Sequence, residues 1–199
     1  MQEIEVKIKL DNPEALMKKV AALGGIKISE QEGLESDIMY NNQAGDFDFD
    51  NPTGKHLRLR KAPYGNVFTY KEKGEEHQNL LQRFEIQTKI ENFEVMDEIL
   101  RKIGFYHFRI KEKFVTKFEL EGLVLEFHKL PFLGDFLEIE AAENTLDVFL
   151  PKLGLSLTKG INKGYSTLFL EYCKQHKIQD DIPMTFEEEK KYASMFGRT

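Results

Sequence analysis

The sequence predicts an α+β fold in which antiparallel strands close into a barrel with flanking helices. Charged residues alternate with apolar residues over most of the expected strands, which is the period of an antiparallel sheet with one polar face. Residues 5–24 align without gaps onto residues 85–104, so two strand–helix halves related by a pseudo-two-fold axis could close one barrel. The 199 residues are 41% hydrophobic, enough for a substantial core.

The elements follow in order from local signals. A strand is expected over residues 2–10, and a helix follows it because Asn12 can cap the helix, Pro13 fits its first position and Gly24-Gly25 can end it. Further strands are expected at residues 26–41, 56–62, 66–73, 80–90, 106–120, 123–130 and 135–142, with a loop at 42–55 and helices at 92–104, 144–153 and 163–176.

The chain divides into one barrel domain over residues 1–176 and a helical tail over residues 177–199. Thr185 and Glu188 form a capping box at the start of the tail helix. The charged run 187–191 is expected to be a solvated helix face, with a homodimer contact as the alternative.

Composition excludes several classes of protein. The net charge of −6 and the pI of about 5.5 argue against general nucleic-acid binding. Cys173 is the only cysteine, so no disulfide within the chain and no cysteine-based zinc site can form. No apolar run has membrane-spanning length and no signal peptide is evident, so we expect a soluble cytoplasmic protein without a membrane partner.

The charged strand faces are the functional signal. Glu3, Glu5 and Lys7 share one face of the first strand, opposite aliphatic residues. The other cations on such faces are Arg58, Arg60, Lys71, Lys73, Arg83, Arg109, Lys111 and Lys113; the acids are Glu85, Glu126, Glu138 and Glu140, with His128 on the face of Glu126. A solvated outer face explains any single strand. Strand-averse charges repeated over most strands fit instead a barrel lumen that binds a charged ligand.

Charge balance indicates the class of ligand. Several Arg and Lys side chains in one lumen repel each other unless a polyanion lies between them, and both residue types bind phosphate. Acids in the same lumen are useful if Mg²⁺ or Mn²⁺ bridges carboxylates and phosphate oxygens. A triphosphate such as ATP, together with a divalent cation, satisfies both sets.

These motifs, in this order, resemble the CYTH superfamily of triphosphate tunnel metalloenzymes over residues 1–172, with the class IV adenylyl cyclase-like branch the most similar. The motifs are Glu3-x-Glu5-x-Lys7, Leu57-Arg58-Leu59-Arg60, Tyr70-Lys71-Glu72, Glu85-Ile86-Gln87-Thr88, Arg109-Ile110-Lys111, Leu133-Gly134-Asp135-Phe136-Leu137-Glu138-Ile139-Glu140 and Gly164-Tyr165-Ser166-x-Leu168. The resemblance implies an eight-stranded antiparallel barrel with a linear triphosphate along its axis.

The resemblance also implies roles for individual residues. Metal ligands would be Glu3, Glu5, Glu138 and Glu140, with Glu85 as a further acidic lumen residue that we add to the metal set. Phosphate ligands would be Lys7, Arg58, Arg60, Lys71, Arg109, Lys111 and Lys113, to which we add Lys73 and Arg83 from the shared strand faces. We assign catalytic work to Glu5, Lys7, Glu126 and His128.

The chain departs from the family pattern at three positions. His128 stands where an aspartate is usual, Lys113 where arginine is common and Gln87 where glutamate is common. His128 could act as a general base, or Glu126 could take the place of the missing acid. The alternative is a neutral lumen histidine with weaker or altered catalysis.

Three functions remain open. The preferred one is an adenylyl cyclase, in which the ribose 3′-oxygen of ATP attacks the α-phosphorus and diphosphate leaves. The second is a triphosphatase acting on inorganic, thiamine or nucleoside triphosphate, and the third is a non-catalytic sensor of polyphosphate or nucleotide. A cyclase needs a base-binding pocket, for which Tyr40, Phe47 and Phe49 are candidates.

Overall fold

The computed structural model describes residues 4–48, 54–77, 80–179 and 181–196. The strands of this part are β1 (Ile4–Leu10), β2 (Ile26–Lys27), β3 (Gly33–Asn42), β4 (His56–Ala62), β5 (Gly65–His77), β6 (Leu80–Ile90), β7 (Phe105–Leu120), β8 (Leu123–Leu130) and β9 (Gly134–Ala141). The helices are α1 (Pro13–Ala22), α2 (Phe93–Lys102), α3 (Glu143–Leu153), α4 (Tyr165–His176) and α5 (Phe186–Phe196), with two 3₁₀ turns at Ser29–Gln31 and Leu157–Lys159. The predicted α+β class with an antiparallel sheet is confirmed.

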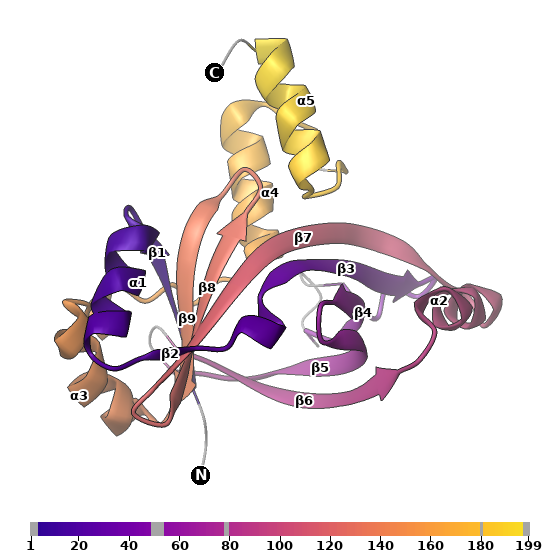
Figure 1. Ribbon diagram of the computed structural model, residues 1–199. Coiled ribbons are helices and arrows are strands. Elements are labelled where there is room, and N and C mark those ends of the chain that lie inside the picture. The colour runs from indigo at the N-terminus through magenta and orange to yellow at the C-terminus, as the bar shows by residue number, and fades with distance from the viewer. Residues whose placement is uncertain (1–3, 49–53, 78–79, 180, 197–199) are drawn as a thin grey trace.

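The sheet differs from the expected eight-stranded closed barrel in two ways. Nine strands are described, in the order β2-β7-β3-β4-β5-β6-β1-β9-β8, with β8 also paired to β7, and β2 is a two-residue addition at the edge of β7. The wall is not fully closed, because β1 and β6 share one described register pair, Glu5 with Leu81. The reason lies in the long β5–β6 hairpin, whose register shifts between Lys73 and Glu76. Such a shift bends the paired strands, and the hairpin diverges from β1 (Figure 1).

Helices α1 and α3 cover the outer face of β1, β8 and β9, on one side of the sheet in Figure 1. The apolar residues that alternate with the charges of β1, Val6 and Ile8, pack there against Leu16 and Val20 of α1. Burial of these side chains contributes roughly 1.5–3 kcal/mol each. Because one face of each strand is used in this way, the charged face is directed to the interior.

The two strand–helix units of the sequence repeat have matching helix caps. The side chain of Asn12 accepts a hydrogen bond from the backbone N–H of Ala15 at 3.0 Å, and that of Asn92 accepts one from Val95 at 2.9 Å. Helix α2 packs at the opposite end of the sheet from α1 (Figure 1), on a cluster that includes Tyr40.

Helix α4 covers a third apolar cluster, and Tyr192 of the neighbouring α5 packs edge-on against Phe132 at the margin of this cluster (Figure 1). The backbone of Met184 accepts from Glu112 N–H at 2.9 Å and donates to Ile110 O at 3.0 Å, and the Glu188 N–H donates to Thr185 Oγ1 at 3.2 Å. The N-cap half of the predicted capping box is therefore present, and the described part of the tail packs on β7. The expected solvated face is partly present, since the exposed Glu187 side chain pairs with Lys191 at 2.9 Å.

Candidate active site

Strand register brings the charged residues into cross-strand rows. Asp37 pairs with Arg60 of β4 on one side and with Lys111 of β7 on the other. Glu138 pairs with both Lys7 of β1 and Glu126 of β8. Since directly paired residues of antiparallel strands project to the same face, these charges converge on one interior space.

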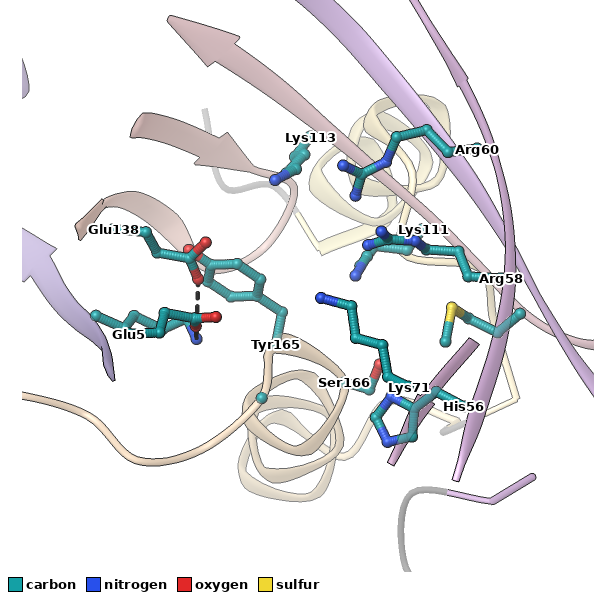
Figure 2. Close-up of a pocket in the computed structure, with 13 residues that line it drawn as sticks. Glu5, His56, Arg58, Arg60, Lys71, Lys111, Lys113, Glu138, Tyr165 and Ser166 are labelled. Atoms are coloured by element: carbon teal, nitrogen blue, oxygen red, sulfur yellow. Dashed lines mark hydrogen bonds and ion pairs between the residues drawn. The ribbon is translucent and has the colours of Figure 1, made fainter. Parts of the chain in front are cut away.

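This space consists of two adjoining cavities of about 80 and 680 Å³. Both are lined by Glu5, Arg58, Arg60, Lys71, Lys113 and Glu138; Lys7, His56, Lys111 and Tyr165 line the smaller one, and Glu85, Lys117, Glu126 and Glu140 the larger. Figure 2 shows Glu5 and Glu138 on one side and Arg58, Arg60, Lys71 and Lys111 on the other. We call Arg58, Arg60, Lys71, Lys111 and Lys113 the cationic wall, and Glu5, Glu138 and Glu140 the acidic wall.

Two buried acids, Glu35 and Asp37, stand behind the cationic wall. Arg60 donates to Asp37 through Nε at 2.7 Å and Nη2 at 2.9 Å, and its Nη1 lies 2.7 Å from Glu35. Asp37 also lies 3.5 Å from Lys111 and 3.8 Å from Arg58. Burial alone would raise the pKa of the Asp37 carboxyl, but the arginines lower it well below its usual range. Burial lowers the pKa of Lys111 to about 8, with Asp37 opposing the shift.

Sequence reasoning missed these two acids. Glu35 and Asp37 alternate with Leu34, Ser36 and Ile38, so the period-two signal used for the other strands was present here as well. Their ion pairs hold the arginine and lysine heads at fixed positions, which is what preorganised anion binding requires.

On the acidic wall, the Lys7 ammonium lies between two carboxylates. Its Nζ is 2.9 Å from Glu138 and 3.2 Å from Glu5, and it sits over the Tyr165 ring at 4.4 Å from the centroid. Burial opposes ionisation of Glu138, but Lys7 and nearby cations hold its pKa well below the usual range. Glu138 is therefore a carboxylate at neutral pH, with Lys7 as its counter-charge.

His128 is 1% exposed and both of its ring nitrogens have partners. Nε2 lies 3.0 Å from Glu126 Oε2 and 3.0 Å from Lys113 Nζ. Nδ1 lies 2.9 Å from the Tyr165 hydroxyl and 3.3 Å from Glu138. Burial, together with the charge of Lys113, lowers the pKa of His128, so the imidazole is neutral near pH 7.

The remaining predicted residues have different positions. Glu85 forms an ion pair with Lys71 and lies 3.9 Å from Arg58, and Glu140 is in register with Glu5. Glu3 lies outside the described residues. The side chains of Lys73 and Arg83 also lie outside the described part, although the backbones of these two residues pair with each other in register. Arg109 lines neither central cavity, and its guanidinium stacks on the Phe108 ring at 4.8 Å. The residue lines a cavity beside Asp181 and a small one that it shares with Lys111 and Ser166.

The base-stacking candidates Tyr40 and Phe47 do not line the central cavities. Tyr40 is fully buried and its hydroxyl donates to Asp97 at 2.6 Å, while Phe47 packs edge-on against Tyr70 and Phe105. Phe49 lies outside the described residues.

The carboxylates of the cavity fit a divalent cation. Glu126, His128 and Glu138 each offer one ligand atom, and these atoms lie within 4.8 Å of one another. Glu5 and Glu140, which line the larger cavity together with Glu126 and Glu138, add further carboxylate oxygens. Oxygen ligands suit Mg²⁺ and Mn²⁺, and an imidazole nitrogen is also compatible with transition metals.

Comparison with known proteins identifies the family. The model of the CYTH domain matches residues 1–149. The chain belongs to the CYTH domain family. A Methanocaldococcus jannaschii protein named "Putative adenylate cyclase MJ0240" is 32% identical over 142 residues, which cover 70% of this chain and 77% of the relative.

Solved structures support the CYTH fold. A Vibrio parahaemolyticus structure titled as a "putative adenylate cyclase" superposes with a TM-score of 0.70 at 18% identity, covering 85% of this chain and 98% of that one. A Hippeastrum structure, whose title reports a dominant triphosphatase activity for a "putative adenylyl cyclase", has a TM-score of 0.57 at 19% identity, covering 92% and 98%. None of the described helices of this CYTH protein has the length and apolarity needed to cross a membrane.

Proposed function

We propose that this CYTH protein is a divalent-metal-dependent triphosphatase, which binds a linear triphosphate in the central cavities and hydrolyses its terminal phosphoanhydride. One observation carries the proposal: the cationic and acidic walls face each other across one interior space. Triphosphates need several cations along the chain of phosphates, and a metal ion bridging phosphate and carboxylate oxygens needs acids beside them.

The cationic wall is suited to the phosphates. Arg58 and Arg60 offer planar forks that can bind two phosphate oxygens, while Lys71, Lys111 and Lys113 act as point charges. Asp37 and Glu35 hold Arg58, Arg60, Lys111 and Lys113 through ion pairs at 2.7 to 3.8 Å, and Glu85 pairs with Lys71. Little reorganisation is therefore needed when charge develops on the transferred phosphoryl group.

The acidic wall is suited to the metal and the water. Glu5, Glu138 and Glu140 would hold a divalent ion, which when bound neutralises charge on phosphate oxygens and activates water. Water attacks the terminal phosphorus, the bond from that phosphorus to its bridging oxygen breaks, and a carboxylate of the acidic wall takes the water's proton. Inorganic triphosphate then gives orthophosphate and diphosphate.

Hydrolysis fits the geometry better than cyclisation. The ring nitrogens of His128 are both engaged by neighbouring side chains, so this residue does not present a base to a ribose hydroxyl. Tyr40 and Phe47 are used in the core, and the Hippeastrum structure indicates that the fold can carry triphosphatase activity. Adenylyl cyclase remains the second candidate, favoured by the name of the Methanocaldococcus jannaschii relative. Retention of Glu5, Glu138 and Glu140 argues against a sensor, since binding alone needs fewer acids.

The test is a product analysis. Purified protein is incubated with tripolyphosphate or ATP and Mg²⁺ or Mn²⁺, and the products are resolved by chromatography. We expect metal-dependent orthophosphate and diphosphate from tripolyphosphate, abolished by Glu5→Gln and retained by Glu187→Gln, a change on the exposed face of α5. Cyclic AMP with diphosphate from ATP would establish the cyclase instead, and tight binding without any product would establish the sensor.

A further inference from the structure

We propose that two copies of this protein associate through helix α2, with the outer faces of the two helices packed in antiparallel orientation about a two-fold axis. The residues concerned line neither central cavity, so this association does not depend on the proposed function. Three features of the helix support it: an exposed apolar face, the contrast with the equivalent helix of the sequence repeat, and the charges beside the face.

The outer face of α2 is apolar. Val95, Ile99 and the C-cap residue Ile103 are four residues apart, so they share one face of the helix, and their exposed fractions are 51%, 49% and 65%. The inner face carries Leu100, which is buried in the cluster that includes Tyr40. The helix lies at one end of the molecule, away from the other helices (Figure 1). A helix with apolar residues on both faces is usually buried on both, so the outer face of α2 is expected to have a partner.

The sequence repeat provides an internal comparison. In the gapless alignment of the two strand–helix units, Ala15 of α1 stands at the position of Val95, and Lys19 stands at that of Ile99. Both α1 residues are exposed, so the first unit presents a small residue and a charge to solvent where the second presents two branched aliphatic residues. The strand–helix unit itself therefore does not require apolar residues at these positions.

The charges beside the apolar face fit a second copy of the same helix. Glu98 and Lys102 are exposed and lie four residues apart on one flank of this face, and neither forms an ion pair within the described part of the chain. A two-fold axis at Ile99 brings Glu98 within one turn, about 5.4 Å along the axis, of the partner's Lys102. The symmetry creates the reciprocal pair as well. Parallel packing would instead place like charges opposite each other, so the charges select the antiparallel arrangement.

The size of the contact determines its strength. Helix α2 has 10 residues and is about 15 Å long, so the pair of helices buries less than the roughly 800 Å² per partner of a standard interface. We therefore expect a weak homodimer that forms as the protein concentration rises. The apolar residues contribute most of the affinity, and the flanking charges determine the orientation.

Sedimentation equilibrium of the full chain, from about 1 to about 500 µM, measures the association. We expect monomer at the lowest concentration and dimer at the highest. Ile99→Glu should weaken the association by about a hundredfold or more, because it places two like charges at the centre of the contact. The matched control is Val148→Glu, which changes an apolar residue of α3 that is 68% exposed, and it should leave the dissociation constant unchanged.

Charge reversal tests the orientation. Glu98→Lys and Lys102→Glu should each weaken the association by about fivefold or more, since each replaces two attractive pairs by two repulsive ones. The double variant, which carries both changes, restores opposite charges across the two-fold axis and should recover the association to within about threefold of the wild type.

Several results would overturn the inference. A monomer at every concentration would do so, and the apolar face would then belong to a different protein. A dimer that Ile99→Glu leaves intact, or that Val148→Glu weakens equally, would place the contact elsewhere. A double variant as weak as the single variants would reject the antiparallel pairing. Circular dichroism separates loss of association from loss of folding, and if Ile99→Glu does not fold, the charge variants, which change exposed side chains, decide.

Discussion

Asp37 is the counter-charge on which the cationic wall depends, and replacing it by asparagine tests the electrostatic reasoning. Its carboxylate lies 2.7 Å from Arg60, 3.5 Å from Lys111 and 3.8 Å from Arg58. With an effective dielectric constant of about 20, each contact has a gross attraction of about 4–6 kcal/mol. Desolvation offsets most of this, and removing one partner of a buried pair costs about 3–5 kcal/mol net. For a domain of this size that corresponds to a melting temperature lower by about 6–20 °C.

The assay is thermal and urea unfolding at pH 7, with and without tripolyphosphate. Asp37→Asn should lower stability in buffer, and tripolyphosphate should restore much of the loss because the polyanion supplies the missing negative charge. Asp147→Asn, an exposed change on α3, should stay within about 0.5 kcal/mol of the wild type. The reasoning is refuted if Asp37→Asn is within about 1 kcal/mol of the wild type, or if tripolyphosphate stabilises both proteins equally.

Three further predictions concern other parts of the structure. Because burial lowers the pKa of Lys111 to about 8, the affinity for tripolyphosphate should fall as the pH rises above about 8. Calorimetry across this range should show the fall in the wild type and a pH-independent affinity in Lys111→Met. A flat profile for the wild type would contradict this prediction. The pKa of Glu35 is lowered in the folded protein, so its carboxylate stabilises the fold above the unfolded pKa, and this stabilisation is lost on acidification. When the pH is lowered below about 4, the free energy of unfolding in urea should therefore fall less for Glu35→Gln than for the wild type. Equal falls would argue against this role of Glu35. Glu189 accepts a hydrogen bond from the Phe132 N–H at 2.7 Å, so Glu189→Ala should cost about 1 kcal/mol in urea unfolding, while the exposed Glu187→Ala should not; equal effects would reject a role for this contact.

The faces of the strands were predictable because side-chain alternation depends only on the local backbone. Val6 and Ile8 lie in the core and Glu5 and Lys7 at the cavity, as the period of two requires. The same holds for the helix cap at Asn92, where an amide side chain precedes an apolar periodic segment.

Features that depend on pairing between distant strands were not predictable. Arg109 shares the alternation of Lys111 in the sequence and pairs with Met39 in the same register as Lys111 with Asp37. Its guanidinium nevertheless stacks on the Phe108 ring and the residue lines another cavity, which local alternation does not indicate. The weak β1–β6 seam was likewise not predictable, because the register shift in the β5–β6 hairpin has no local signature in the sequence.

The role of Tyr165 was also hidden. It comes from the first turn of α4, beyond the residues that the family model matches, and it reaches the site only because α4 packs against the barrel. The segment Gly164-Tyr165-Ser166 was among the motifs that resemble the family, but nothing in the sequence indicates the hydrogen bond between Tyr165 and a histidine 37 residues away.

The most direct test of the central claim is a crystal structure of the protein with tripolyphosphate and Mn²⁺, in which anomalous scattering locates the metal. The account predicts a linear triphosphate between the two walls, its oxygens on Arg58, Lys71 and Lys111, and Mn²⁺ beside Glu138. A triphosphate bound on the exterior, or Mn²⁺ remote from the acidic wall, would contradict it.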